Sequence, residues 1–258
     1  MENTQDTPSF VTPQGRRIAY HLTDGTGPAV VFLGGFKSDM GGTKAVHLEE
    51  WARASGRAFL RFDYSGHGES SGAFTDGCIG DWFEDAAAAI GLLAGKVILV
   101  GSSMGGWISL LVAKAMPEKV AGMVTIAAAP DFTEDSMWAG FTDAQKRELM
   151  AGQVALPSEY GEPYIITRRL IEEGRARLVL RDPLTLNFPA RFLQGTADRD
   201  VEMSVALRLL DHASGSDMRL TLVDGADHRF SDEDCLDLIV SSVEDVLRRS
   251  ARDTAPPT

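Results

Sequence analysis

Residues 97–107 read VILVGSSMGGW, and this stretch decides the fold that the chain is expected to adopt. The apolar run Val97–Val100 is typical of a strand that is buried on both faces, and Gly105–Met116 has a helical pattern that ends before a proline. The five residues from Gly101 to Gly105 fit G-x-S-x-G, the nucleophile elbow, in which a serine occupies a sharp strand-to-helix turn. The register selects Ser103, because a motif centred on the preceding serine would need glycines where Val100 and Met104 stand. The alternative is a structural Gly/Ser turn that begins a helix.

A serine hydroxyl needs a base, and five histidines are available: His21, His47, His67, His212 and His228. After a nucleophile elbow the chain order is serine, acid, histidine, so only the last two qualify. His212 ends a predicted helix, where capping of the helix terminus explains it. His228 lies on the loop between the last predicted strand and the last helix, at the carboxyl edge of a sheet, where open α/β sheets bind ligands. The sequence therefore predicts His228 as the general base.

Three aspartates could orient that histidine. Asp198 directly follows the predicted strand at Ala190–Leu193 and is the predicted acid. Asp200 is interpreted as the N-cap of the next helix. Asp131, which follows the apolar strand Val120–Ala127, remains an alternative acid.

Two backbone N–H groups are needed to stabilise a tetrahedral intermediate. One is predicted to come from Met104, at the helix start after the nucleophile. The other is predicted to come from Phe36, in the loop GGFKS at 34–38, although a plain glycine turn between strand and helix is the alternative. Trp107 and Trp138 are candidate substrate-binding residues, against the alternative that both belong to the core.

Short β-rich runs alternate with helical patterns along the chain, which predicts an α/β fold with a doubly wound, mostly parallel sheet of about eight strands. A hairpin of Ser9–Thr12 with Arg16–Leu22 is expected at one edge. From Asp131 to Asn187 there is no strong strand, and amphipathic patterns at Thr142–Gly152 and Pro163–Gly174 predict a small helical cap. The expected organisation is one domain at 9–250 with flexible tails at 1–8 and 251–258. The further predicted elements are strands at 29–33, 58–62, 97–100 and 218–223 and helices at 43–54, 79–94, 201–212 and 232–249.

The composition is that of a soluble globular protein. Acidic residues outnumber basic ones 37 to 25 in 258 residues, and the net charge of −12 disfavours nucleic acid and anionic membranes as partners. The start MENTQDTPSF has no signal-peptide pattern, and no apolar run reaches the ~18 residues of a membrane span. Cys78 and Cys235 are expected to be free thiols in the cytoplasm. The chain contains no P-loop, G-x-G-x-x-G or H-E-x-x-H motif, so no cofactor and no metal is predicted.

Four stretches carry a family resemblance: GFKSDMGGTKAVHLEE at 35–50, RFDYSGHGESS at 61–71, VGSSMGGW at 100–107 and PEKV at 117–120. On these residues the sequence resembles the mitochondrial palmitoyl-protein thioesterase family of the α/β-hydrolase superfamily. Members of that family are also described as mycophenolic acid acyl-glucuronide esterases. The resemblance runs from about residue 15 to 248 and implies an α/β-hydrolase fold, a triad of Ser103, Asp198 and His228, and a small-molecule or S-acylated protein substrate. The acidic composition and the lack of a transit-peptide pattern favour a bacterial, cytoplasmic member.

Three function classes follow. The first is a serine hydrolase that cleaves acyl thioesters or carboxylic esters through an acyl-serine intermediate. The second is another chemistry of the same fold, such as C–C bond hydrolysis or peptide hydrolysis. The third is a binding module that kept the fold without catalysis. Because a fold does not determine a function, the substrate prediction depends on the resemblance.

Overall fold

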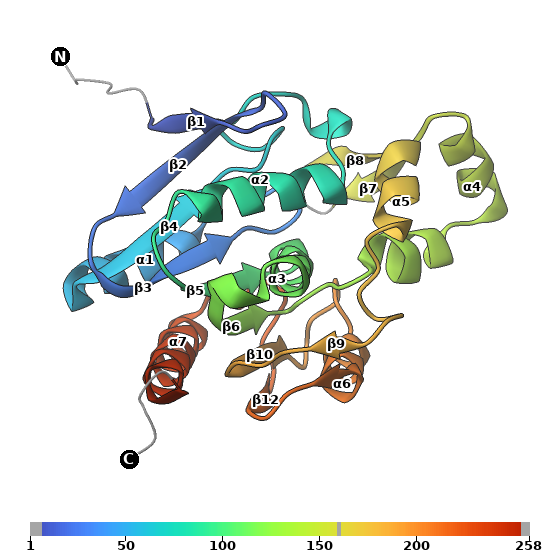
Figure 1. The fold of residues 1–258 in the computed structure, drawn as a ribbon. Helices are drawn as coiled ribbons and strands as arrows, with labels where there is room; N and C mark the ends of the chain where they lie inside the picture. Colours follow the sequence, from blue (N-terminus) through green and yellow to red (C-terminus); the bar gives the residue numbers. More distant parts are fainter. Residues whose placement is uncertain (1–6, 159–160, 254–258) are drawn as a thin grey trace.

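The computed structural model describes residues 7–158 and 161–253, and a single large sheet runs through the centre of this part (Figure 1). The order of its eight strands is β1-β2-β4-β3-β5-β6-β10-β12. β1 and β2 are antiparallel to their neighbours, and all other pairs are parallel. The predicted fold class and the predicted edge hairpin are therefore confirmed. The strand bounds are β1 (Ser9–Val11), β2 (Arg17–Thr23), β3 (Thr26–Leu33), β4 (Arg57–Phe62), β5 (Val97–Ser102), β6 (Val120–Ile126), β10 (Ala190–Gly195) and β12 (Met218–Val223).

Helices cover both faces of this sheet, and the strand side chains divide between two cores. Val31 of β3 and Leu99 of β5 face one core, which they share with α2 (Ile79–Gly91) and α3 (Met104–Ala115). The neighbouring Val30 and Ile98 face the other core, which they share with α1 (Thr43–Ser55) and α7 (Glu233–Asp253). Successive residues of a strand point to opposite faces, so a strand between two helical layers must be apolar throughout. The continuous apolar runs in the sequence have this origin.

The boundaries of the elements around the sheet's carboxyl edge differ slightly from the predicted ones. The helix predicted from residue 201 is α6 (Met203–His212), and its N-cap is Glu202, which makes no side-chain capping bond. Asp200 is therefore not the N-cap, and that interpretation is wrong. Short elements complete the fold around the sheet: the 3₁₀ turns η1 (Phe74–Asp76) and η2 (Pro117–Lys119), and the parallel pair that β9 (Leu184–Thr185), near the end of the segment between β6 and β10, forms with β11 (Ala213–Ser214).

The insertion between β6 and β10 is not purely helical. It contains a π-helical segment η3 (Thr133–Trp138), α4 (Asp143–Met150), the antiparallel strands β7 (Gln153–Ser158) and β8 (Gly161–Thr167), and α5 (Arg168–Arg175). The helix predicted over Pro163–Gly174 is wrong in its first half, because residues up to 167 pair with β7 and only the remainder is α5. The apolar residues whose spacing favoured one helix lie in two elements: Ile166 is buried in β8, and Leu170 is buried in α5. Figure 1 shows α4, α5, β7 and β8 together at one end of the molecule.

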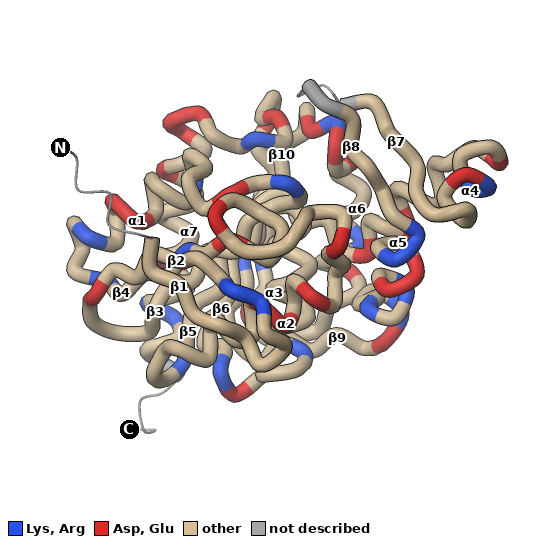
Figure 2. Tube along the Cα trace, turned by 90° about the horizontal axis from the view of Figure 1, so that it is seen from above, with Lys and Arg blue, Asp and Glu red and all other residues tan. Residues whose placement is uncertain are grey.

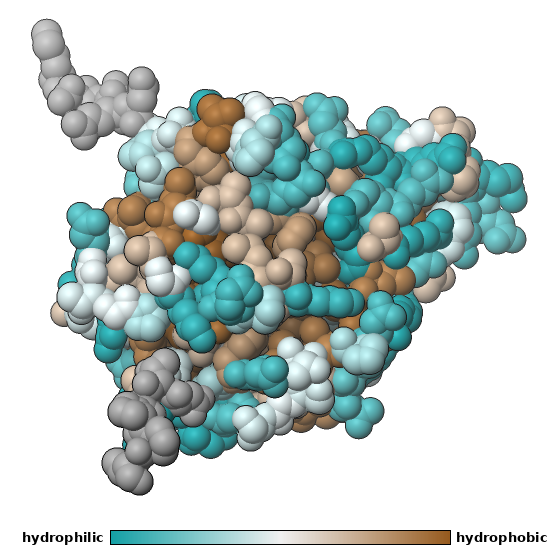
Figure 3. All heavy atoms as spheres, viewed as in Figure 1, coloured by the Kyte–Doolittle hydropathy of each residue, from teal (hydrophilic) through white to brown (hydrophobic). Residues whose placement is uncertain are grey.

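The surface agrees with the composition of the chain. Figure 2 shows Lys and Arg interspersed with Asp and Glu along the trace rather than gathered into one basic segment. Figure 3 shows a mostly hydrophilic surface over α4 and α5. Among the described residues, no helix has the length and apolarity that crossing a membrane requires. The predicted tails lie largely outside the description, at 1–6 and 254–258.

Candidate active site

The turn between β5 and α3 holds Ser103 in a strained backbone conformation. Its φ of 54° and ψ of −117° are rare for a residue with a side chain. Three backbone bonds hold this conformation: the Ser103 N–H donates to the carbonyl of Ile126 (2.9 Å), and the Ser103 carbonyl accepts from the N–H groups of Ala129 (3.1 Å) and Gly106 (2.9 Å). Ser102 is buried, whereas Ser103 is half-exposed. Of the two serines, Ser103 is the one that combines the strained backbone with an accessible side chain.

The glycines on either side of Ser103 are required by close backbone contacts. A Cβ at Gly101 would lie 2.4 Å from the carbonyl oxygen of Gly105. A Cβ at Gly105 would lie 2.0 Å from the carbonyl oxygen of Leu33, at the end of β3. The start of α3 thus packs directly on the carboxyl end of the neighbouring strand. This contact brings the loop after β3 beside the serine.

His228 and Asp198 form a hydrogen-bonded pair on two adjacent loops. Nδ1 of His228 lies 2.9 Å from Oδ2 of Asp198, whose side chain is fully buried. The Asp198 carboxylate also accepts the N–H groups of Asp200 and Val201 and the side-chain amide of Gln194. Burial raises the pKa of Asp198, but the hydrogen bonds with His228 and Val201 outweigh burial and place that pKa below its ordinary range. The Asp198 carboxyl is therefore ionised near neutral pH and holds the Nδ1 side of the imidazole.

The loop that carries His228 is fastened to the start of α1. The ammonium of Lys44 donates to the carbonyl of Arg229, the residue after the histidine (2.5 Å). Burial lowers the pKa of Lys44, and the nearby carboxylate of Asp227 opposes that shift. A segment far away in sequence therefore fixes the position of the loop that carries His228.

The alternative residues have other partners. Asp131, fully buried at a φ of 58°, accepts the N–H groups of Val179 (2.7 Å) and Leu180 (3.0 Å), and so joins the two ends of the insertion. Burial raises the pKa of Asp131 above its ordinary value despite these bonds. His212 lies 2.8 Å from the carbonyl of Asp182 through Nε2. Neither residue belongs to the His228–Asp198 pair.

Two backbone N–H groups near the serine are unpaired within the described part of the chain. A Cβ placed on Gly35 would lie 3.5 Å from Cβ of Ser103, so the loop after β3 passes directly beside Ser103. Phe36 follows in that loop, and Met104 begins α3. Within the described part of the chain, the N–H groups of Phe36 and Met104 have no hydrogen-bond acceptor. Both are available to an oxygen atom of a ligand.

A cavity of about 1000 Å³ opens over this arrangement, and both Ser103 and His228 line it. One part of its wall is aromatic and apolar, which suits an acyl group. The rings meet edge to face, with Phe36 lying 5.7 Å from Phe132 and 6.0 Å from Tyr164. This wall includes Phe36, Phe132, Met137 and Tyr164.

Neither predicted substrate-binding tryptophan lines the cavity. Trp107 is fully buried in α3, and its indole N–H donates to the carbonyl of Arg177 (3.1 Å). Its ring packs edge to face against the ring of Phe132 (5.6 Å between centroids). The ring of Trp138 is covered by the guanidinium of Arg175 (4.5 Å) and the ammonium of Lys146 (5.3 Å). Residues from the insertion line the wall instead. No periodic pattern in the sequence distinguishes these residues from core residues. The one signal is that Phe132 directly follows Asp131, which the sequence offered as an alternative acid.

A metal is not needed to explain the acidic groups. Asp198, Asp200 and His228 have potential ligand atoms within 4.8 Å of one another. However, the first and third of these residues bond to each other, and the Asp198 carboxylate is further occupied by backbone N–H groups. The hydrogen bonds of the His228–Asp198 pair therefore explain why these three side chains lie close together.

The β5–α3 turn with Ser103 and the loops with Asp198 and His228 lie within a segment that matches a known protein family. The model of the alpha/beta hydrolase family matches residues 30–253. The chain belongs to the alpha/beta hydrolase family. Membership identifies it as a hydrolase.

The relatives of this hydrolase agree with the resemblance drawn from the sequence. Mitochondrial palmitoyl-protein thioesterase ABHD10 of Rattus norvegicus is 34% identical over 238 residues, which cover 91% of this chain and 80% of that protein. A solved structure from Agrobacterium vitis S4 is 40% identical with a TM-score of 0.90 and covers 94% of this chain and 98% of that one. The structure of alpha/beta hydrolase domain-containing protein 10 from mouse is 31% identical with a TM-score of 0.87. The match covers 95% of this chain and 99% of the mouse chain. The predicted family is confirmed.

Proposed function

We propose that this chain is a serine hydrolase that cleaves acyl thioesters or carboxylic esters through an acyl-serine intermediate. The observation that carries the proposal is the common cavity of Ser103 and His228, with His228 bonded to a buried, ionised Asp198. A strained serine that shares a cavity with an imidazole whose Nδ1 is held by a carboxylate fits the arrangement of a nucleophile, its base and its orienting acid.

In the proposed mechanism, the Ser103 hydroxyl attacks the acyl carbonyl while Nε2 of His228 accepts its proton. The carbonyl oxygen becomes an oxyanion, which the N–H groups of Phe36 and Met104 stabilise. The carbon–sulfur or carbon–oxygen bond then breaks, and the acyl group remains on the serine. A thiolate leaves readily and then takes up the proton from His228, whereas an alkoxide needs that proton in order to leave. Water, deprotonated by His228, releases the carboxylic acid and restores the serine.

The substrate class follows from the cavity and from the relatives. The aromatic wall gives an acyl chain an apolar surface next to the serine. ABHD10 is named as a palmitoyl-protein thioesterase, so an S-acylated protein or a small acyl ester is the proposed substrate. A cytoplasmic location stays a prediction from the composition, since the relative ABHD10 is named as a mitochondrial protein.

The test compares the two serines of the motif. We expect Ser103→Ala to lower kcat by roughly a thousandfold or more, as the loss of a triad member does, and Ser102→Ala to stay within about tenfold of the unaltered protein because Ser102 is not the motif serine. The substrates are p-nitrophenyl esters, acyl-CoA and S-acyl peptides of several chain lengths. A fluorophosphonate probe should label Ser103, as mapped by mass spectrometry of peptides. Labelling of Ser102 in active protein, or hydrolysis of peptide bonds with no esterase activity, would contradict the proposal.

A further inference from the structure

The residue after the proposed oxyanion donor is itself strained. Lys37 has a φ of 59°, in the left-handed region that a residue with a side chain seldom occupies. Its N–H donates to Nε2 of His67 (3.2 Å). The carbonyl of Phe36 and this N–H belong to one peptide plane, so His67 fixes the plane that directly follows Phe36.

The other nitrogen of His67 is fixed as well. Nδ1 lies 3.2 Å from the carbonyl of Ser65. A carbonyl can only accept, so Nδ1 carries the proton and Nε2 presents a lone pair to the Lys37 N–H. The two contacts therefore require the tautomer with its proton on Nδ1. In this tautomer Nε2 can accept the Lys37 N–H and so hold the loop that contains Phe36 and Lys37.

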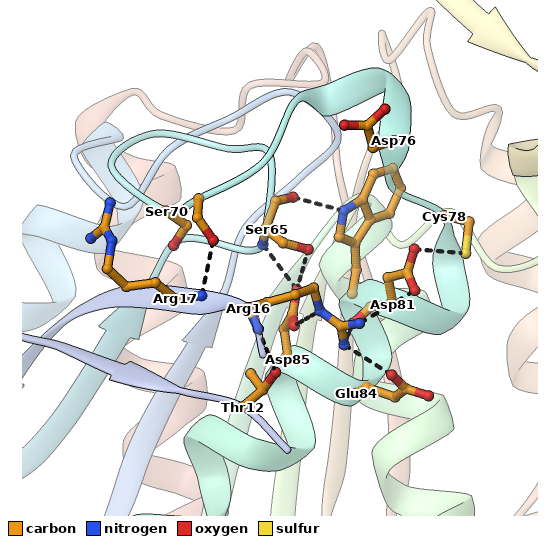
Figure 4. Close-up of polar contacts among 12 residues, drawn as sticks. Thr12, Arg16, Arg17, Ser65, Ser70, Asp76, Cys78, Asp81, Glu84 and Asp85 are labelled. Carbon is orange, nitrogen blue, oxygen red and sulfur yellow. Dashed lines mark hydrogen bonds and ion pairs between the residues drawn. The ribbon is translucent and has the colours of Figure 1, made fainter. Parts of the chain in front are cut away.

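Ser65 in turn is tied to α2. Figure 4 shows Ser65 donating to the carboxylate of Asp85, which also accepts from the guanidinium of Arg16. The Ser65 N–H and hydroxyl lie 2.9 and 2.6 Å from Oδ2 of Asp85, whose side chain has no exposed surface. The imidazole is therefore attached to a rigid part of the fold.

Packing keeps this imidazole neutral. The ring is 4% exposed and meets the rings of Tyr64, Phe74 and Trp82 edge on, at 5.6, 5.2 and 5.2 Å. Burial lowers the pKa of His67 to about 4, and the hydrogen bond to Ser65 opposes that shift. Near neutral pH, Nε2 thus remains an acceptor.

We propose that His67 is a positioning residue of the oxyanion hole, which acts through the Lys37 N–H to aim the Phe36 N–H at the Ser103 site. The inference rests on the proposed function. If the bond to His67 is lost, the strained peptide after Phe36 can relax, and the Phe36 N–H turns away from the oxygen that it stabilises. Substrate in the ground state needs this donor little, whereas the tetrahedral intermediate needs it strongly.

The experiment uses three variants of the full chain. His67→Phe keeps an aromatic ring in the cluster but removes the acceptor. His67→Gln places an amide oxygen within reach of the Lys37 N–H and restores an acceptor. Tyr64→Phe is the matched control, because its ring touches His67 and its buried hydroxyl has no hydrogen-bond partner among the described residues. For each variant we would measure kcat and KM on one ester, the affinity for an alkylboronic acid that forms a tetrahedral adduct, the affinity for the product carboxylate, and the melting temperature.

We expect His67→Phe to lower kcat by about tenfold to a hundredfold, part of the roughly 10²–10³ lost when a donor is removed altogether. Boronate affinity should fall with it, while KM and product affinity stay within about twofold. His67→Gln should recover most of the loss, and Tyr64→Phe should resemble the unaltered protein. A folded His67→Phe with unchanged kcat and boronate affinity overturns the inference. An equal loss of boronate and product affinity, or a His67→Gln as impaired as His67→Phe, also overturns it.

The two proposals can fail separately. If esterase activity depends on Ser103 but not on His67, only the inference about His67 fails. If the chain shows no activity that depends on Ser103, the proposed function fails and the inference fails with it.

Discussion

Nδ1 of His228 lies 2.9 Å from Oδ2 of Asp198, and the two residues follow neighbouring parallel strands of the sheet. β10 and β12 end in register, with Gly195 opposite Val223, so the loops that follow them start side by side. The pair is therefore a direct product of sheet topology.

Asp198→Asn should lower kcat by roughly 10³–10⁴, because the amide can hold the imidazole in the wrong tautomer. The control is Asp131→Asn, which alters an equally buried carboxylate that fastens the insertion through Val179 and Leu180. We expect that control to lower the melting temperature while kcat stays within about tenfold. Steady-state kinetics and thermal unfolding of both variants test this, and a reversed order of kcat would assign the acid to Asp131.

Acyl-chain selectivity should depend on Met137 and not on its neighbour Trp138. Met137 lines the cavity, whereas the Trp138 ring lies against Arg175 and Lys146. Met137→Ala should change the ratio of kcat/KM for long and short acyl chains by about tenfold, in the range that a few methylene groups confer. Trp138→Ala should leave the ratio within about twofold. An effect of Trp138→Ala as large as that of Met137→Ala would show that the tryptophan contacts the acyl chain.

Glu49 should make the fold sensitive to acid. Its side chain is 3% exposed and bonds to Arg61 (2.8 Å), Arg53 (2.8 Å) and Thr23 (2.9 Å). Burial raises the pKa of Glu49, but the bonds with Arg61 and Thr23 outweigh burial, so the folded pKa lies below the unfolded value. A depressed folded pKa means that the stabilisation is complete above the unfolded pKa and is lost as the pH falls through the folded pKa.

The corresponding measurement is urea unfolding at pH 7, 5 and 3 for Glu49→Gln beside the unaltered chain. The variant should be less stable by roughly 1–3 kcal/mol at pH 7, and the difference should shrink towards pH 3. A difference that is constant or grows on acidification would rule out this role of Glu49.

The two thiols should be inert in the folded protein. Cys78 and Cys235 are each 1% exposed, and burial raises both pKa values to about 12. Thiolate is the reactive form, so iodoacetamide at pH 8 should modify neither residue within the time in which it alkylates urea-unfolded protein completely. Esterase activity should persist after treatment. Rapid labelling of native protein, seen by mass spectrometry, would show that a cysteine is accessible.

Gly105→Ala should prevent the turn from forming. The new methyl group would lie 2.0 Å from the carbonyl oxygen of Leu33, which is backbone and cannot move aside. Gly91→Ala at the end of α2 meets no atom within 4 Å and should be neutral or stabilise the fold by up to about 1 kcal/mol. The yield of folded protein and the melting temperature separate the two variants. A folded, fully active Gly105→Ala would refute the close packing of α3 on β3.

The sequence by itself determined much of this protein. The buried apolar runs, the helical patterns and the elbow around Ser103 predicted the fold class and the edge hairpin, because strand burial and turn chemistry are local properties of the chain. The predicted triad residues also follow from local context and chain order. Asp198 and His228 lie on the loops that follow β10 and β12, and the structure brings the two side chains together.

Only the tertiary structure decided which residues surround the site. The sequence could not show that Trp107 is buried against Phe132 or that Trp138 lies against Arg175, since both contacts depend on how the insertion packs. The β7–β8 strands were missed because residues 163–174 have a spacing of apolar residues that suits a helix as well as a strand followed by a helix. The contact of His67 with Lys37 joins residues 30 positions apart. Such pairs are set by the packing of distant segments, which no local pattern encodes.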